Sequence, residues 1–267
     1  MLECVVNVSE GKDLATISAL ADRLGIDLLD VHSDGDHHRS VFTLIGTEQV
    51  RVLARQAIAT IDIGRHIGVH PRIGVVDVVP FVPLELSTFD EALVARNEFA
   101  EFAAQELGVP CFLYGPERTL PFVRAHAFKE LLPDIGPRHP HPTAGAMCVG
   151  ARNILVAYNL WLKNVSLEET KLVATSLRNE SVRALGLQVG EFTQVSMNLI
   201  DPSIVGPHDV YDRVAEKFDI QRAELVGLIP ARILATIPRA RWAELDLDNE
   251  RTIEWRIARR NQLGRGG

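Results

Sequence analysis

The sequence has little of what membrane proteins, disulfide-bonded secreted proteins and nucleic-acid-binding proteins require. No apolar run approaches the roughly 20 residues of a membrane-spanning helix, and the opening MLECVVNVSEG lacks the basic stretch of a signal peptide. The three cysteines, Cys4, Cys111 and Cys148, have no metal-like spacing, and each lies in an apolar stretch that suits a reduced, buried thiol. A formal net charge of −7 disfavours binding to phosphate backbones. We therefore expect a cytoplasmic protein that binds neither a membrane nor a nucleic acid.

What is present is a globular composition with a repeated pattern of elements. The 267 residues are 46% apolar and 24% charged. Periodicity predicts strand, helix, strand, strand, helix and strand over about 2–8, 13–24, 26–32, 39–46, 48–61 and 73–82. A helix opened by Thr88-x-x-Glu91 and a strand in VPCFLYG follow. The basic C-terminal RTIEWRIARRNQLGRGG is interpreted as a solvated helix and frayed tail.

The same order returns after the proline-rich segment 115–144, which we interpret as a joint. It comprises a strand in ARNILVAYNLWL, a helix from the Ser166-x-x-Glu169 box, strands in RALGLQV and FTQVSMNLI, a helix at about 207–218, and a strand in AELVGLI. We predict an α+β protein of two βαββαβ units, residues 1–144 and 145–267. Their helix-free sheet faces are expected to face each other across a ligand cleft.

A histidine-bearing loop stands out in RHIGVHPRIGVVDVVPF, residues 65–81. His66 and His70 are four residues apart, but the glycines and prolines around them exclude a helix, so the spacing alone does not make them metal ligands. Asp77 lies among branched apolar residues, where a carboxylate needs a partner. It could orient His70 or Arg72, or it could cap the end of a strand.

Two further loops carry histidine, and one strand has a polar face. LLDVHSDGDHHRSVF contributes His32, His37 and His38, and GPRHPHPTAG contributes His139 and His141. A composite metal site is one interpretation, although no H-E-x-x-H signature is present, and we assign no metal ligand. In FTQVSMNLID, the side chains of Gln194, Ser196 and Asn198 share one face. That face could line a polar ligand or simply contact solvent.

The histidine loop resembles the active-site segment of the formiminotransferase domain of formiminotransferase-cyclodeaminase, the glutamate formimidoyltransferase family. The family pattern is approximately RH-x-G-E-H-P-R-M-G-A-L-D-V, and this sequence has RHIGVHPRIGVVDV. Further similar motifs follow in the same order: VNVSEG, LLDV, GVPCFLYG, PDIGP, GARNILVAYN, TQVSMNL and AELVGLIP. The similarity runs from about residue 2 to about residue 237.

The resemblance implies transfer of a formimino group from N-formiminoglutamate to tetrahydrofolate, on two ferredoxin-like subdomains with the folate between their sheets. This is a reaction of one-carbon metabolism and histidine catabolism, and we expect a homodimer. The catalytic histidine falls on His70, with His66 as its neighbour. The folate-contacting loop falls on Gly136, Arg138, His139, His141, Thr143 and Gly145. Candidates for binding the substrate are Arg72 and Arg39, which suit a carboxylate, with His32, His38, Asn7, Gln194, Ser196 and Asn198.

The sequence departs from the family pattern at several positions of the expected site. His32 replaces an aspartate, His38 an asparagine, Val69 a glutamate and Ala144 a tryptophan, and a basic glycine-rich insertion before Leu185 is missing. Two alternatives therefore stay open: a metal-dependent amide or amidine hydrolase that uses the clustered histidines, and a non-catalytic protein that binds a ligand.

Overall fold

The computed structural model describes residues 1–66 and 72–264, and the chain divides into two compact units, Met1–Asn153 and Ile154–Gly267. The strands are β1 (Leu2–Val8), β2 (Leu28–Asp34), β3 (Arg39–Ile45), β4 (Val76–Pro83), β5 (Cys111–Tyr114), β6 (Met147–Ala151), β7 (Val156–Leu162), β8 (Val182–Val189), β9 (Phe192–Leu199) and β10 (Ile220–Val226). The helices are α1 (Leu14–Asp22), α2 (Glu48–Thr60), α3 (Phe89–Leu107), α4 (Leu120–His126), α5 (Leu167–Leu177), α6 (Pro207–Ala215), α7 (Ala231–Leu234) and α8 (Ile253–Leu263). Short 3-10 turns are Gly25–Asp27, Ile63–Arg65, Arg239–Arg241 and Asn249–Arg251.

The first unit is built on a six-stranded sheet in the order β2-β3-β1-β4-β6-β5. Its first four strands form the predicted βαββαβ arrangement and pair antiparallel, with the order fourth, first, third, second when read from β4. This is the order of a ferredoxin-like unit. β6 and β5 then extend the sheet in parallel to β4.

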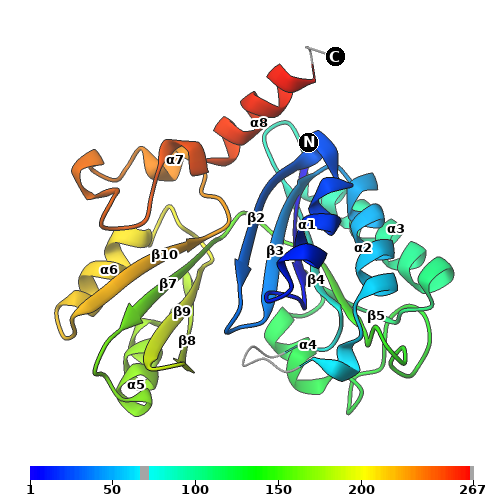
Figure 1. Ribbon diagram of the computed structural model, residues 1–267, viewed down its shortest axis with the longest axis horizontal. Helices are drawn as coiled ribbons and strands as arrows, with labels where there is room; N and C mark the ends of the chain where they lie inside the picture. The colour runs from blue at the N-terminus through cyan, green and yellow to red at the C-terminus, as the bar shows by residue number, and fades with distance from the viewer. Residues whose placement is uncertain (67–71, 265–267) are drawn as a thin grey trace. The chain divides into compact units, whose positions relative to one another are not determined.

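Both faces of the first sheet are covered, but by different helices. α1, α2 and α3 lie along one face, where Leu20, Leu53 and Phe99 are buried against Val6 and Phe42 of the strands (Figure 1). On the other face, at the β4-β6-β5 end, Val123 of α4 packs with residues of β4, β5 and β6 in a separate apolar cluster. The rest of that second face, from β2 to β1, carries the predicted site residues Asn7, His32 and Arg39.

The second unit repeats the ferredoxin-like order in a four-stranded antiparallel sheet, β10-β7-β9-β8. α5 and α6 cover one face, where Tyr158, Leu160 and Val195 are buried (Figure 1). The hydroxyl of Tyr158 donates a hydrogen bond to the carbonyl of Leu245, which joins the segment before α8 to the same core. The α+β class and the duplicated strand order predicted from periodicity are therefore both confirmed.

The helix starts follow the predicted capping chemistry. Thr88 and Ser166 each accept a hydrogen bond from the backbone N–H three residues later, and the carboxylates of Glu91 and Glu169 accept one from the backbone N–H of the cap residue. These reciprocal bonds satisfy backbone donors that the first turn of a helix would leave without a partner. They explain why α3 and α5 begin where they do.

The joint predicted at 115–144 is more ordered than its proline content suggests. It contains α4, which starts after the cap Thr119 with a proline in its first turn. The strand expected over ARNILVAYNLWL corresponds to β7, whereas β6, just before it, was not predicted and pairs with β4 and β5 of the first sheet. For this reason the division of the chain falls after Asn153, beyond the expected boundary at residues 144 and 145.

α7 and the 3-10 turns near the C-terminus were not predicted, whereas α8 matches the helix expected in the basic tail. Cys4, Cys111 and Cys148 are free and buried, as expected. Across residues 1–66 and 72–264, no helix combines the length and the apolar character needed to cross a membrane.

Candidate functional site

Asp77 is a buried carboxylate at the start of β4, where the register between β1 and β4 shifts. Its side chain is held by two donors. The backbone N–H of Ile73 donates to Oδ1 at 2.7 Å, and the guanidinium of Arg124 on α4 pairs with Oδ2. The bond from Ile73 fits the interpretation of Asp77 as a cap at the end of a strand. Arg124 was not predicted as a site residue. Its ion pair with Asp77 links α4 to β4.

Three guanidinium groups lie around this one carboxylate. Burial lowers the pKa of Arg39 to about 10, the charges of Arg124 and Arg72 act in the same direction, and that of Asp77 opposes them. Burial also lowers the pKa of Arg72, again against the effect of Asp77. Asp34 also acts on Arg39, so the three guanidinium groups outnumber the two carboxylates near them. Such a cluster can bind an anionic group.

Arg72 also connects the end of the histidine loop to the β2–β3 turn. Its Nη2 donates to the carbonyl of His37 at 2.9 Å, and its Nη1 donates to the carbonyl of His38 at 3.2 Å. Nη1 contacts both ring nitrogens of His66 and lies 2.6 Å from Nδ1. Arg72 therefore supports the loop at the same place where it was predicted to bind a substrate carboxylate.

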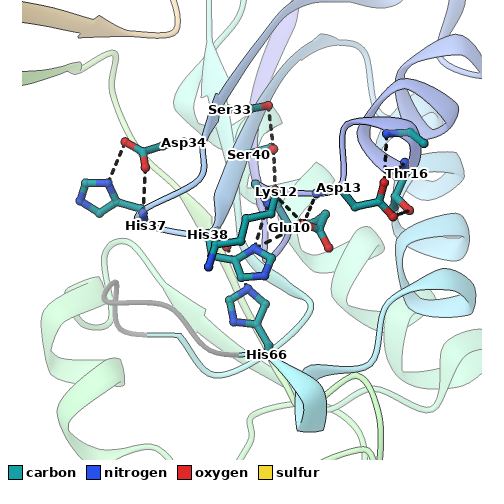
Figure 2. Close-up of polar contacts among 12 residues, drawn as sticks. Glu10, Lys12, Asp13, Thr16, Ser33, Asp34, His37, His38, Ser40 and His66 are labelled. Atoms are coloured by element: carbon teal, nitrogen blue, oxygen red, sulfur yellow. Dashed lines mark hydrogen bonds and ion pairs between the residues drawn. The ribbon is translucent and has the colours of Figure 1, made fainter. Parts of the chain in front are cut away.

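The rings of His38 and His66 form a tilted pair between the β2–β3 turn and the histidine loop (Figure 2). Their ring centroids are 3.9 Å apart with an interplanar angle of 34°. Burial lowers the pKa of both rings, and Arg72 lowers each of them further. The Nε2 of His66 lies 2.9 Å from the carbonyl of His38. Both imidazoles are neutral at pH 7 and so can accept a proton.

His37 and His32 do not join this pair. The Nδ1 of His37 lies 2.9 Å from Asp34 (Figure 2), and although burial raises the pKa of Asp34, hydrogen bonds from His37 lower it to about 2. His32 on β2 and Asn7 on β1 are both in register with Val41 of β3. His32, Asn7 and Arg39 consequently share one face of the first sheet, as a binding surface would require. His70 lies outside the described residues.

The loop 136–145 contacts the end of the histidine loop through its backbone. Gly74 and Gly145 form an antiparallel bridge, Val75 donates to the carbonyl of Ala144, and Ile63 donates to that of Thr143. A Cβ on Gly145 would lie 2.3 Å from the carbonyl oxygen of Ile73, so this approach requires glycine.

Side chains of the 136–145 loop are arranged around a tight turn. The Nδ1 of His141 accepts from the backbone N–H of Ala144 at 3.0 Å and lies 3.3 Å from that of Thr143. Arg138, His139 and Thr143 are exposed, and so is Gly136, whose φ is 93°. The predicted folate-contacting segment therefore presents exposed polar groups, and the backbone of its C-terminal end contacts Ile73 and Gly74.

Gln194, Ser196 and Asn198 lie on the face of the second sheet opposite α5 and α6, as alternation predicted. Gln194 is fully buried, and neither atom of its amide has a hydrogen-bond partner among the residues the structure describes. Ser196 is half-buried and Asn198 exposed. Gln194 is in register with Trp161, whose Nε1 donates to Glu224 at 2.9 Å. A buried amide without partners is costly unless a ligand or water supplies them.

The histidines do not assemble into a metal site within the described part of the chain. In residues 1–66 and 72–264, no group of three or more histidine, cysteine, aspartate or glutamate side chains is placed to hold a metal ion. The contacts that the structure does show for His37, His38 and His141 are with carboxylates and backbone groups.

Arg124 and Glu10 are the residues of this site that pattern reasoning missed. Arg124 lies in the segment interpreted as a joint, and its contact with Asp77 spans 47 residues. Glu10 belongs to VNVSEG, a motif singled out for its resemblance alone, and lies 3.3 Å from His38. The family motif was therefore the available signal for Glu10, and none existed for Arg124.

Comparisons with known proteins agree with the motifs. The Formiminotransferase domain, N-terminal subdomain, matches residues 1–152. The glutamate formimidoyltransferase of Streptococcus pyogenes serotype M1 is 33% identical over 95% of this chain and 97% of its own length. That of Thermoplasma acidophilum is 31% identical over 90% of this chain and 91% of its own length.

Longer relatives match as well. The formimidoyltransferase-cyclodeaminase of Sus scrofa is 34% identical over 88% of this chain, but only over 51% of its own length. The chain thus spans about half the length of the cyclodeaminase-containing relatives and nearly all of the glutamate formimidoyltransferases. With a domain match over the first unit and relatives that extend through both units, this chain belongs to the formiminotransferase family.

Proposed function

We propose that the protein transfers the formimino group of N-formiminoglutamate to tetrahydrofolate. The observation that carries the proposal is the cluster of Arg39, Arg72 and Arg124 around one buried carboxylate, in a member of this family. N-formiminoglutamate has two carboxylates, and guanidinium groups bind carboxylates through paired, charge-assisted hydrogen bonds. The charge of the cluster therefore suits this donor.

The reaction needs a group that exchanges protons near neutral pH. A folate amine attacks the formimino carbon, a new C–N bond forms, and the C–N bond to glutamate breaks. One proton leaves the attacking amine and one is returned to the leaving amine, which an imidazole can do. We assign this role to His70. Its loop runs between His66 and Arg72, both of which contact the β2–β3 turn.

Folate is proposed to bind through the loop of Gly136, Arg138, His139, His141, Thr143 and Gly145. The exposed polar groups of this loop and its backbone bridge to Gly74 support the assignment. Gln194 is proposed to hydrogen-bond the bound ligand, because its buried amide has no partner among the described residues. Asn7, His32, His38, Ser196 and Asn198 complete the proposed set, together with the arginines.

The proposed setting is cytoplasmic one-carbon metabolism and histidine catabolism, with the protein acting as a homodimer. Three buried, free cysteines suit a reducing compartment. Sedimentation equilibrium tests the oligomeric state: a mass of twice 29.5 kDa is expected.

The proposed function is tested by measuring glutamate release from N-formiminoglutamate with and without tetrahydrofolate, in the presence of a chelator. A transferase releases glutamate only with folate and is insensitive to the chelator. Release without folate, abolished by the chelator, would instead identify a metal-dependent hydrolase. Folate binding without any turnover would identify a ligand-binding protein.

A further inference from the structure

A carboxylate and an imidazole, Glu10 and His38, meet beside the start of the histidine loop (Figure 2). Glu10 lies between β1 and α1, and His38 lies in the β2–β3 turn. The Nδ1 of His38 is 3.3 Å from Oε1 of Glu10, and both side chains are only 14% exposed. A partly buried pair at this distance interacts more strongly than one in water.

Glu10 is fixed as a charged group. Its Oε1 accepts hydrogen bonds from the backbone N–H groups of Lys12 at 2.8 Å and Asp13 at 2.9 Å. Although burial acts in the opposite direction, these bonds and the charge of His38 lower the pKa of Glu10. A carboxylate stays beside His38 throughout the neutral pH range.

The Nδ1 of His38 faces two partners with opposite requirements. The backbone N–H of Gly11 donates to it at 3.1 Å, which requires an unprotonated nitrogen. Glu10 requires an N–H at the same atom. Each protonation state of Nδ1 therefore has a partner in place, and a change of state needs no rearrangement of the backbone.

The other ring nitrogen of His38 is available. Among residues 1–66 and 72–264 the structure gives Nε2 no hydrogen-bond partner. His38 has a φ of 51°, a left-handed conformation that is uncommon for residues other than glycine, and such conformations concentrate at functional sites. The imidazole ring of His38 also packs against the ring of His66.

His66 is held neutral by its contacts. The Nη1 of Arg72 contacts both ring nitrogens of His66, and a guanidinium N–H can donate only to a nitrogen without a proton, so this contact disfavours the doubly protonated ring. Of the charged groups near His38, Lys12 and Arg72 oppose its protonation and Glu10 favours it. Within the pair, His38 is the ring in direct contact with Glu10, although the charge of Glu10 also favours protonation of His66.

We propose that His38 is a second acid–base residue of the site, with Glu10 stabilising its imidazolium form. The inference rests on the proposed function, in which the attacking folate amine loses one proton and the leaving glutamate amine gains one. His38 shares the proton exchange assigned above to His70: in the neutral tautomer whose Nδ1–H faces Glu10, Nε2 has no proton and takes one up as the new C–N bond forms. The imidazolium, held by Glu10, gives a proton back as the bond to glutamate breaks, so protons and charge balance over the cycle.

The test compares pH profiles of kcat for the wild type and three variants. His38→Asn keeps an acceptor for the Gly11 N–H and tolerates a positive φ, but it cannot carry a proton. We expect a fall in kcat of about 100-fold or more with little change in KM, and the loss of one ionisation from the profile. Glu10→Gln should shift that ionisation to lower pH by about one unit, because the imidazolium loses its counter-ion. His208→Asn, on α6 of the second unit, is the matched control and should leave the profile unchanged.

The outcomes separate this inference from the function on which it rests. Wild-type turnover with an unchanged profile in a folded His38→Asn variant would overturn the inference and leave the proposed function intact. An ionisation that Glu10→Gln does not move would overturn the role of Glu10. If the wild-type protein shows no turnover, both the proposed function and the inference about His38 are contradicted. The melting temperature of each variant shows whether it has folded.

Discussion

Asp77 is buried inside the first unit, and each of its two carboxylate oxygens contacts a donor. The bond from Ile73 is local and follows from the turn before β4. The pair with Arg124 depends on how α4 packs against β4. The sequence therefore predicted a buried carboxylate that needs a partner, but could not identify the partner, because no periodicity relates residues so far apart.

The Asp77–Arg124 pair is expected to contribute strongly to stability. Asp77→Asn keeps the acceptor for Ile73 but leaves Arg124 without its counter-ion, so the free energy of unfolding should fall by about 3 kcal/mol in urea denaturation. The control is Glu106→Gln, which breaks the half-exposed pair with Arg55. That change should cost less than about 1 kcal/mol. Equal losses in both variants would show that Asp77 is not held as described.

The lowered pKa values of His38 and His66 predict how the stability of the protein depends on pH. Burial, with Arg72, places the pKa of His38 and His66 below the ordinary imidazole value of about 6.5. Below that value the unfolded chain binds more protons than the folded one, so stability is full above about pH 6.5 and falls as pH drops. Each ring contributes at most about 1.4 kcal/mol per pH unit.

Urea denaturation at about pH 7.5 and about pH 5.5 measures this dependence. In the double variant His38→Asn/His66→Asn, the free energy of unfolding should depend much less on pH. Asp34, with a pKa of about 2, does not contribute in this range, because its effect is lost only at lower pH. The same slope in wild type and variant would contradict the assignment.

At the scale of elements, the long segments were predictable and the short ones were not. Capping boxes in the sequence mark the first residues of α3 and α5. The strands of both ferredoxin-like units show alternation or branched apolar runs. α4 has seven residues and β6 has five, too few for periodicity to show. Both are stabilised by packing against β4 and β5 rather than by local preference.

The capping boxes predict the effect of a single hydroxyl. Ser166→Ala removes the bond to the backbone of Glu169 and should lower the free energy of unfolding by about 1 kcal/mol. Ser176→Ala on the same helix is the control, because it removes a hydroxyl bonded to a carbonyl within the helix and introduces a better helix former. Its expected effect is no more than a few tenths of a kcal/mol. A loss in the control as large as that in Ser166→Ala would mean that the cap does not carry the effect.

The contact between the 136–145 loop and Gly74 predicts a steric effect. Gly145 and Gly190 both have positive φ, but only at Gly145 would a Cβ meet backbone atoms. Gly190→Ala should cost about 1 kcal/mol for its conformation alone. Gly145→Ala should cost clearly more and weaken folate binding, as measured by denaturation and calorimetry. If Gly145→Ala and Gly190→Ala lower the free energy of unfolding by similar amounts, the close contact between Gly145 and the backbone of Ile73 is contradicted.

At the scale of the whole molecule, one strand order occurs twice, and the candidate site residues that lie in strands are on the sheet face opposite the helices that complete each ferredoxin-like repeat. Alternation could predict this because a strand with one polar and one apolar face fixes which side carries the helices. The pairing of His38 with Glu10 and His66 could not be predicted, since it joins three separate segments and involves a left-handed backbone at His38. The family motifs indicated the reaction. The structure shows the cluster of Arg39, Arg72 and Arg124, whose charge suits the carboxylates of N-formiminoglutamate.

The most direct test of the account is to follow the transferred carbon itself. N-formiminoglutamate labelled with 13C in the formimino group is incubated with the protein and tetrahydrofolate, and the carbon is observed by NMR. We predict that the label moves to the folate while an equal amount of glutamate is released, and that it stays on glutamate when folate is omitted. Label that appears in formamide, or that leaves glutamate without folate, would contradict formimino transfer as the function of this protein.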